Sequence, residues 1–272
     1  MISRKTTQIA CSLLITHSAG LCAASPTLLI SQGTTMYRYH NGSVQSYTVS
    51  DVINGMTNVP MGVTVGNMNG GASNGDILAL GGTAVYRVDN ALGNPVLTQI
   101  GVRGGPNASP VFVGNRLFGI AGVLPHGSTL VEWDSNFNQI NAWATGVFGG
   151  PGGIVAVPGT TDEFYYSEFI TDAIWHYKIG NATSTFVCST PNNDYVGLEM
   201  VGNTIYATYA LPGTGQFVLG TQALNGTFTQ LAVLDSYHTG ITGLARIIPA
   251  PAPVAGLALG GMLSLRRRRC GA

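Results

Sequence analysis

The sequence predicts an all-β protein, a single β-propeller domain of five four-stranded sheets, from three observations. Gly supplies 38 of the 272 residues and charged residues only 9%, which favours many turns and few helices. Short apolar runs recur along the chain with Gly, Pro or Asn between them. One apolar run, Ile241–Ala245, is left over after the last complete copy, while the first copy lacks a strand.

The repeat is clearest in residues 152–188, where four strand-like runs follow one another. Turn residues, Pro158-Gly159 and Gly180-Asn181, break this stretch, as expected for one antiparallel sheet of a propeller. The four runs are Gly153–Val157, Glu163–Ser167, Ala173–Ile179 and Thr185–Cys188.

A similar turn is predicted after the first strand of each copy. Gly and Asn suit it because they tolerate positive φ, and the interval of 44 to 48 residues is typical of propeller blades. These turns are Val65-Gly66-Asn67, Val113-Gly114-Asn115, Val157-Pro158-Gly159 and Val201-Gly202-Asn203.

The third and fourth strands also align. Alternation in the third strands predicts large side chains packed between sheets and charges, such as those of Arg38 and His40, facing water or pairing across blades. Asn-Gly pairs, as at Asn41-Gly42 and Asn225-Gly226, predict type I′ turns after them. The third strands are Met36–His40, Val85–Asp89, Leu130–Asp134, Ile174–Lys178 and Val218–Gln222, and the fourth are Val44–Val49, Val96–Ile100, Ile140–Thr145, Thr185–Cys188 and Phe228–Val233.

We expect Ile241–Ala245 to pair with Thr27–Ile30, so that the last strand completes the first sheet and closes the ring. Closure removes free inner edges, the usual way in which circular β-folds avoid aggregation. A six-bladed ring or an open sandwich is the alternative if residues 51–76 are divided differently.

The two ends of the sequence predict where the protein is delivered. Residues 1–24 have the pattern of a secretory signal peptide, with Arg4 and Lys5, an apolar stretch and small residues before a cleavage site at Ser25. The propeller domain is then 25–248. The segment 249–272 has three parts: Pro249, Pro251 and Pro253, then apolar residues 254–265, then Arg266, Arg267, Arg268 and Arg269. Twelve residues span only about 18 Å as a helix, short of the roughly 30 Å hydrocarbon core.

This tail resembles the PEP-CTERM sorting signal of Gram-negative bacteria that export polysaccharide. The resemblance covers residues 249–269 and implies secretion across the inner membrane, a transient membrane contact through 254–265, an exosortase-like sorting enzyme as partner and delivery to the cell surface, outer envelope or extracellular matrix. Ala250 or Ala252 stands where the family has Glu, which leaves processing by the usual enzyme open. The alternative is an ordinary short tail anchor.

Charge and cysteine content exclude some classes. Between the two ends the sequence contains 6 basic residues and all 12 acidic ones. This negative net charge disfavours nucleic acid as a partner. Cys188 is the single cysteine of the body, so no internal disulfide is expected.

A cluster of acidic and aromatic residues is one candidate site. Carboxylates beside aromatic rings suit a saccharide, and two carboxylates about 5–10 Å apart would suit a glycosidase. The alternative is a solvated acidic loop with aromatic residues of the core. The residues are Asp162, Glu163, Tyr165, Tyr166, Glu168, Asp172 and Trp175.

Glu199 is a second candidate, because it interrupts an apolar inner strand and would serve as a ligand-binding or catalytic acid. The alternative is a channel glutamate satisfied by water, since no other inner strand carries an acid. Residues 67–76, ending at Asp76, faintly resemble a calcium loop of FG-GAP-like propellers, or form a flexible Gly/Asn corner. No metal-ligand spacing, nucleophile motif, phosphate loop or haem signature is present, so no cofactor is predicted.

The sequence is compatible with three functions. The first is an exported, non-catalytic propeller that binds a polysaccharide or a surface protein. The second is an extracellular hydrolase or lyase acting on polysaccharide, and the third is a structural envelope component. Absence of paired acids on the predicted inner strands favours binding over catalysis, because the fold alone does not imply an activity.

Overall fold

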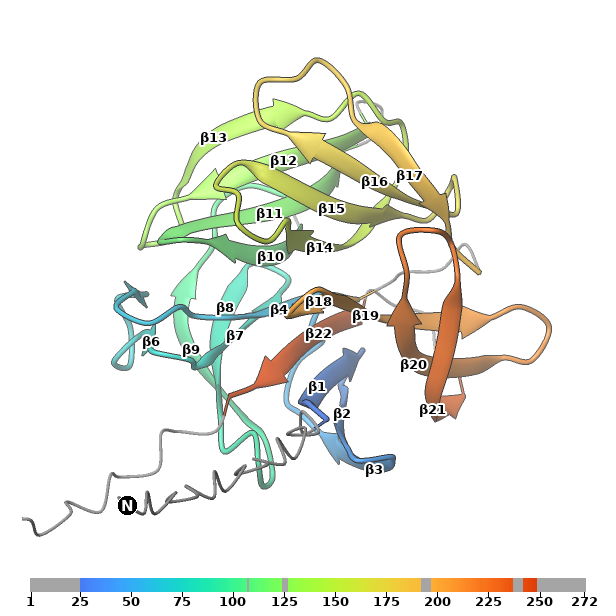
Figure 1. Cartoon of the computed structure of the whole chain (residues 1–272). Helices are drawn as coiled ribbons and strands as arrows, with labels where there is room; N and C mark the ends of the chain where they lie inside the picture. The colour runs from blue at the N-terminus through green and yellow to red at the C-terminus, as the bar shows by residue number, and fades with distance from the viewer. Residues whose placement is uncertain (1–24, 107, 124–126, 192–196, 237–241, 249–272) are drawn as a thin grey trace, which may run out of the picture.

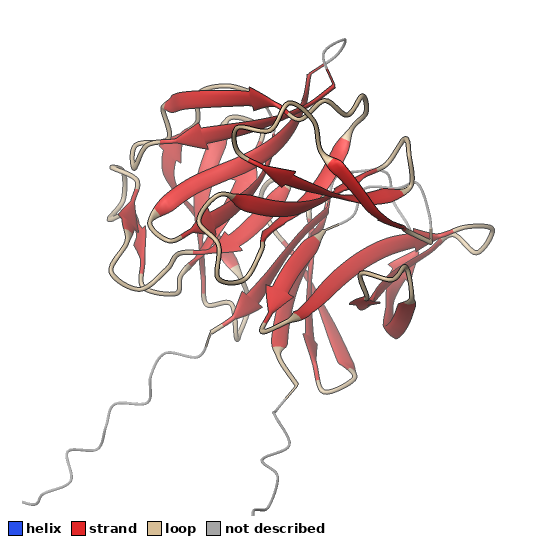
Figure 2. Cartoon of the chain, turned by 45° about the horizontal axis from the view of Figure 1, so that its top comes forward, coloured by secondary structure: helices blue, strands red, loops and turns tan. Residues whose placement is uncertain are grey.

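The computed structural model describes residues 25–106, 108–123, 127–191, 197–236 and 242–248, and these consist of strands and connecting loops (Figure 2). The predicted signal peptide 1–24 and sorting tail 249–272 lie outside the described residues. In the described part of the chain, no helix is long and apolar enough to cross a membrane.

Five four-stranded antiparallel sheets are arranged as the blades of a β-propeller (Figure 1). Blade 1 is β22 (Thr242–Ile247), β1 (Thr27–Gln32), β2 (Thr35–His40) and β3 (Ser43–Thr48), and blade 2 is β4 (Gly55–Asn58), β7 (Ile77–Gly81), β8 (Ala84–Asp89) and β9 (Val96–Val102). Blade 3 is β10 (Ala108–Val113), β11 (Arg116–Val123), β12 (Gly127–Trp133) and β13 (Gln139–Ala144). Blade 4 is β14 (Pro151–Ala156), β15 (Glu163–Glu168), β16 (Ala173–Lys178) and β17 (Thr185–Ser189), and blade 5 is β18 (Leu198–Val201), β19 (Thr204–Leu211), β20 (Gln216–Gln222) and β21 (Phe228–Ser236).

The predicted closure of the ring is confirmed. β22, near the C-terminal end of the described chain, pairs antiparallel with β1 and becomes the inner strand of blade 1 (Figure 1). Leu29 lies opposite Ala245 and Ile30 opposite Leu244. Five blades follow, so the six-bladed ring and the open sandwich are wrong.

The prediction was wrong between residues 51 and 76. The inner strand of blade 2 is β4, and a two-stranded hairpin of β5 (Thr64–Val65) and β6 (Ala72–Ser73) is inserted between β4 and β7. The turn Val65-Gly66-Asn67 therefore belongs to this insertion rather than to the end of an inner strand. Val59 closes the insertion, because its backbone bonds Gly75 and Asp76.

The turns depend on positive φ where it was predicted. Gly114, Gly159 and Gly202 have φ of 60°, 80° and 61°. The type I′ prediction is confirmed at Asn41-Gly42, where φ is 48° and 80°. It is wrong at Asn225-Gly226, because only Gly226 has positive φ and the Ala223 amide bonds the Thr227 carbonyl across a longer loop.

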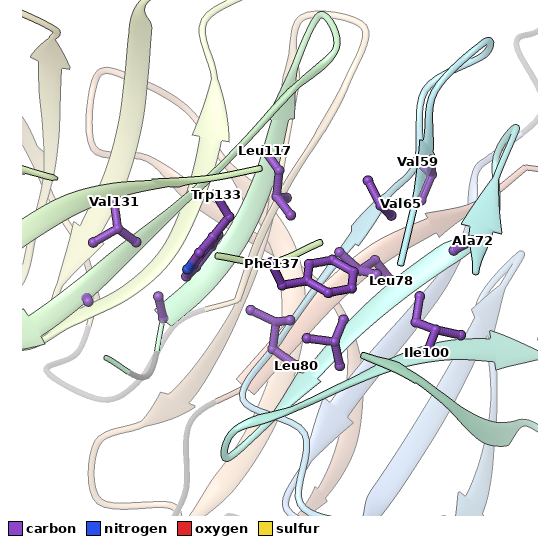
Figure 3. Close-up of a cluster of buried hydrophobic side chains, with 13 residues drawn as sticks. Val59, Val65, Ala72, Leu78, Leu80, Ile100, Leu117, Val131, Trp133 and Phe137 are labelled. Atoms are coloured by element: carbon purple, nitrogen blue, oxygen red, sulfur yellow. The ribbon is translucent and has the colours of Figure 1, made fainter. Parts of the chain in front are cut away.

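Apolar side chains fill the five joints between neighbouring blades. At the joint of blades 2 and 3, the ring of Phe137 lies among Leu78, Leu80 and Ile100 (Figure 3). At the joint of blades 3 and 4, Phe118 meets the edge of Phe164 with ring centroids 5.1 Å apart. The predicted packing of alternate large residues between sheets is confirmed.

Two prominent ion pairs form within a blade rather than across blades. Arg87 Nε lies 2.6 Å from Asp89 Oδ1 in the same strand, and Arg116 Nε lies 2.7 Å from Glu132 Oε1 on the neighbouring strand. Neighbours on one face of a sheet are close enough for this pairing.

Glycines let the inner strands approach closely at one end. A Cβ on Gly55 would lie 2.5 Å from Pro110 Cδ and 2.8 Å from Ser109 Cα, and one on Gly243 would lie 3.0 Å from the Gly55 carbonyl carbon. Ser109 fits its position because its hydroxyl donates to the Gly152 carbonyl at 2.6 Å. The innermost layer thus admits only very small side chains.

Gly55→Ala is expected to lower the free energy of unfolding by about 1–3 kcal/mol, because the methyl group overlaps backbone and ring atoms of blade 3. Gly104→Ala is the matched control, since a Cβ there meets its nearest atom at an ordinary 3.6 Å and φ is not positive. Chemical denaturation of both variants measures the difference. Equal midpoints for the two variants would show that the close inner layer does not limit stability.

Candidate functional site

The acidic and aromatic cluster of blade 4 divides between two ends of one strand. Glu163 begins β15, opposite Lys178, and Glu168 ends it, opposite Ala173. Five residues of extended chain separate the two Cα atoms by about 16 Å. The two carboxylates therefore do not converge on one point.

At the first end, Glu163 belongs to an ion-pair network. Its Oε1 lies 2.9 Å from Lys178 Nζ and its Oε2 lies 2.9 Å from His176 Nε2, while Asp162 Oδ2 lies 3.7 Å from the same Nζ. Hydrogen bonds from Lys178 and then His176 lower the pKa of Glu163. Tyr165 packs on the His176 ring with centroids 5.4 Å apart. This arrangement keeps Glu163 ionised, so it does not provide a proton donor near neutral pH.

At the other end, Glu168 holds two loops together. Its Oε1 accepts hydrogen bonds from the Gly150 and Ile170 amides at 2.6 and 2.9 Å, and its Oε2 accepts from the Thr171 amide and hydroxyl, both at 2.7 Å. The residue is 1% exposed. Four donors satisfy the carboxylate, which makes its role structural.

The remaining members of the cluster also separate. Tyr166 is fully buried, its hydroxyl lies within 3.1 Å of those of Thr145 and Ser184, and burial raises its pKa to about 12. Asp172 occupies a turn with φ of 50°. Trp175 is half-buried and donates to Thr171 Oγ1 at 3.1 Å. Of the three aromatic residues in this cluster, Tyr165 and Trp175 keep part of their surface exposed and Tyr166 does not.

Glu199 lies on β18, in the joint where blade 5 meets blade 1. Tyr206 is its cross-strand neighbour and packs into the apolar cluster of this joint with Leu244. Burial raises the pKa of Glu199 from its ordinary value of 4.5 to about 8, although the charge and backbone of Arg246 on β22 oppose the rise. A carboxyl group with a raised pKa is thus placed beside the strand that closes the ring.

Asp76 lies in a turn and shows no metal-binding geometry. Its Oδ2 accepts a hydrogen bond from the Ser73 amide at 2.8 Å, while its own amide donates to the Ser73 carbonyl at 3.0 Å. Throughout the described ranges, no three His, Cys, Asp or Glu side chains are placed together to hold a metal ion.

Sequence reasoning missed two surface grooves. One of about 710 Å³ runs along β17 beside the turn of blade 5, and includes Cys188, Pro191 and Asn225. Another of about 320 Å³ lies beside Arg38 and His40 on blade 1. Alternation had already placed Arg38 and His40 on one face, but the wall that completes this groove comes from another blade.

Glu199→Gln is expected to change how stability depends on pH. An acid whose pKa rises on folding stabilises the protein while protonated, so stability is full below pH 4.5 and falls as pH rises toward 8, by at most about 1.4 kcal/mol per pH unit. The variant should lose this slope. Denaturation midpoints between pH 4.5 and 8 measure it, with Glu163→Gln as control, because a lowered pKa titrates below this range. An unchanged slope in Glu199→Gln would contradict the assignment.

Comparison with known proteins gives distant structural likeness only. No protein-family model matches the chain, and no curated protein matches it. A chain from a nidogen–laminin complex is 13% identical over 82% of this chain and 99% of its own length, with a TM-score of 0.49. A protein of unknown function from Bacteroides caccae is 12% identical, with the same coverage of both chains and a TM-score of 0.46. The fold assignment therefore rests on the strand pairing of the chain itself.

Proposed function

We propose that this protein is an exported, non-catalytic binding propeller that presents its blade loops and grooves to a saccharide or a surface protein. Its tail directs it to the cell surface, outer envelope or extracellular matrix through an exosortase-like enzyme. The proposed localisation rests on the sequence of the two ends. These are the N-terminal segment, with Arg4, Lys5 and the apolar stretch after them, and the C-terminal residues 249–269.

The observation that carries the binding function is the dispersal of the acids. Glu163 is paired with Lys178 and hydrogen-bonded to His176, and Glu168 is saturated by loop donors at the other end of the strand. Glu199 lies on a different blade and faces a cation. Hydrolysis of a glycosidic bond needs two carboxyl groups about 5–10 Å apart, whereas Glu163 and Glu168 lie at opposite ends of β15, about 16 Å apart.

The fold supports binding because it holds loops in fixed positions. Glu168 joins the loop at Gly150 to the turn at Thr171, and the Gly152 carbonyl is bonded by Ser109 of the preceding blade. A surface that is already ordered loses little conformational entropy when a ligand binds. Shallow grooves between blades then provide contact area without a reaction centre.

One observation favours a second function, an extracellular polysaccharide hydrolase or lyase. The pKa of Glu199, about 8, matches what a general acid requires at neutral pH. The partner required would be a base, whereas the group that faces Glu199 is the cation of Arg246.

Saccharide-array binding combined with a reducing-sugar release assay separates these functions. The binding function predicts retention on at least one class of saccharide, with no release of reducing ends. Release that disappears in Glu199→Gln would establish the hydrolase instead. Failure to bind any saccharide would contradict the saccharide form of the proposal and leave a protein ligand or a structural envelope role.

A further inference from the structure

The groove beside Arg38 lies at the joint of blades 1 and 2. It has a volume of about 320 Å³, at the lower end of the roughly 300–1,000 Å³ of ligand pockets. One wall comes from β1, β2, β3 and the turn between β2 and β3, and the other comes from Leu92 in the turn between β8 and β9. The groove is therefore completed only when the two blades assemble.

Arg38 differs from most basic residues of the propeller in having no acidic partner. Among residues 25–248, Arg87, Arg116 and Lys178 form ion pairs with carboxylates, and Arg246 faces Glu199. Arg38 forms no ion pair with any carboxylate in the described ranges. Its positive charge is thus left for a group from outside the chain.

The guanidinium of Arg38 is held in place but is not saturated. Its Nη2 donates to Gln45 Oε1, and its carbon lies 5.6 Å from the centre of the Tyr47 ring. Its Nη1 is buried and has no hydrogen-bond partner in the described part of the chain. The rest of the Arg38 side chain keeps part of its surface exposed and lines the groove, so an anion there would meet its positive charge.

Further polar groups surround this cation. Thr27 Oγ1 lies 2.8 Å from His40 Nδ1, and Asn41 Nδ2 lies 3.0 Å from His40 Nε2. Ser43 adds a further hydroxyl. These hydroxyl and amide groups both donate and accept, as the hydroxyl groups of a sugar require.

Leu92 supplies an apolar wall and separates this groove from a second one. Its side chain is 56% exposed and lines both grooves, the second having a volume of about 300 Å³. The second groove contains Asp89, whose charge is engaged by Arg87 Nε at 2.6 Å and by the Thr98 hydroxyl at 2.6 Å. The cation of Arg38 therefore lies on one side of Leu92, and the carboxylates of Asp76 and Asp89 lie on the other.

We propose that this groove binds an acidic saccharide, with the carboxylate of a uronic acid on the Arg38 guanidinium and the apolar face of the sugar ring against Leu92. This inference rests on the proposed binding function and names its ligand class. A single guanidinium suits one carboxylate, which it can bind through two parallel hydrogen bonds. Thr27, Asn41 and Ser43 would then bind ring hydroxyl groups.

Titration calorimetry with oligogalacturonate as the probe tests the proposal. Arg38→Gln should weaken binding about 10- to 100-fold, because it removes the charge and keeps a polar side chain of similar shape. Lys178→Gln is the matched control, since it removes one positive charge on blade 4 and should leave affinity unchanged. Carboxyl-reduced oligomers should bind the wild type as weakly as oligogalacturonate binds Arg38→Gln.

Leu92→Asp provides a second variant on an exposed side chain, and its added charge should abolish binding without affecting the core. Equal affinity of wild type and Arg38→Gln for oligogalacturonate would overturn the assignment of this groove as the binding site. The proposed binding function would still stand. Array binding to neutral saccharides alone would do the same. Binding to no saccharide at all would overturn both the groove and the saccharide form of the binding function. Millimolar sulfate could also displace oligogalacturonate from the groove. If the groove bound sulfate as tightly as the oligosaccharide, it would be a simple anion site, and the saccharide assignment would be overturned.

Discussion

The pairing of β22 with β1 is the interaction on which the structure depends. It joins the last described strand to the first, so that each blade has a neighbour on both sides. The joint that it closes buries Leu28, Ile30, Tyr37, Phe217 and Leu244, and each such side chain contributes about 1.5–3 kcal/mol on burial. If β22 detached, this joint would open to water and the inner edge of β1 would lose its partner. The partly exposed ion pairs within the blades contribute little by comparison.

Closure also determines where open space lies between the blades. Small residues at Gly55, Ser109 and Gly243 bring the inner strands together, which leaves little space at that level of the ring. Available space lies instead at the outer parts of the joints, where side chains from one blade meet a turn of the next. The Arg38 groove is of this kind, because Leu92 belongs to blade 2 and the cation to blade 1. The orientation of the blades therefore controls the shape of the binding surface.

Much of the fold could be predicted from the sequence because strand alternation and turn chemistry are local. Met36–His40 and Ile174–Lys178 show their two faces directly, and Asn41-Gly42 specifies its own turn. The error at residues 51–76 had a physical cause. Val65-Gly66-Asn67 has the composition of an inner-strand turn, and only the pairing of Gly55 with Leu80 identifies the true inner strand.

The candidate sites were harder to predict because they depend on distant partners. Glu168 looked like a free acid in the sequence, whereas backbone amides of Gly150 and Ile170 saturate it. The unpaired state of Arg38 appears only when the positions of the other charges are known. The central account is tested most directly by comparing the unfolding of a chain that ends at residue 248 with one that ends at residue 236. Loss of β22 should abolish the cooperative unfolding transition. A shortened chain with the same midpoint and the same cooperativity would show that the ring does not depend on this closure.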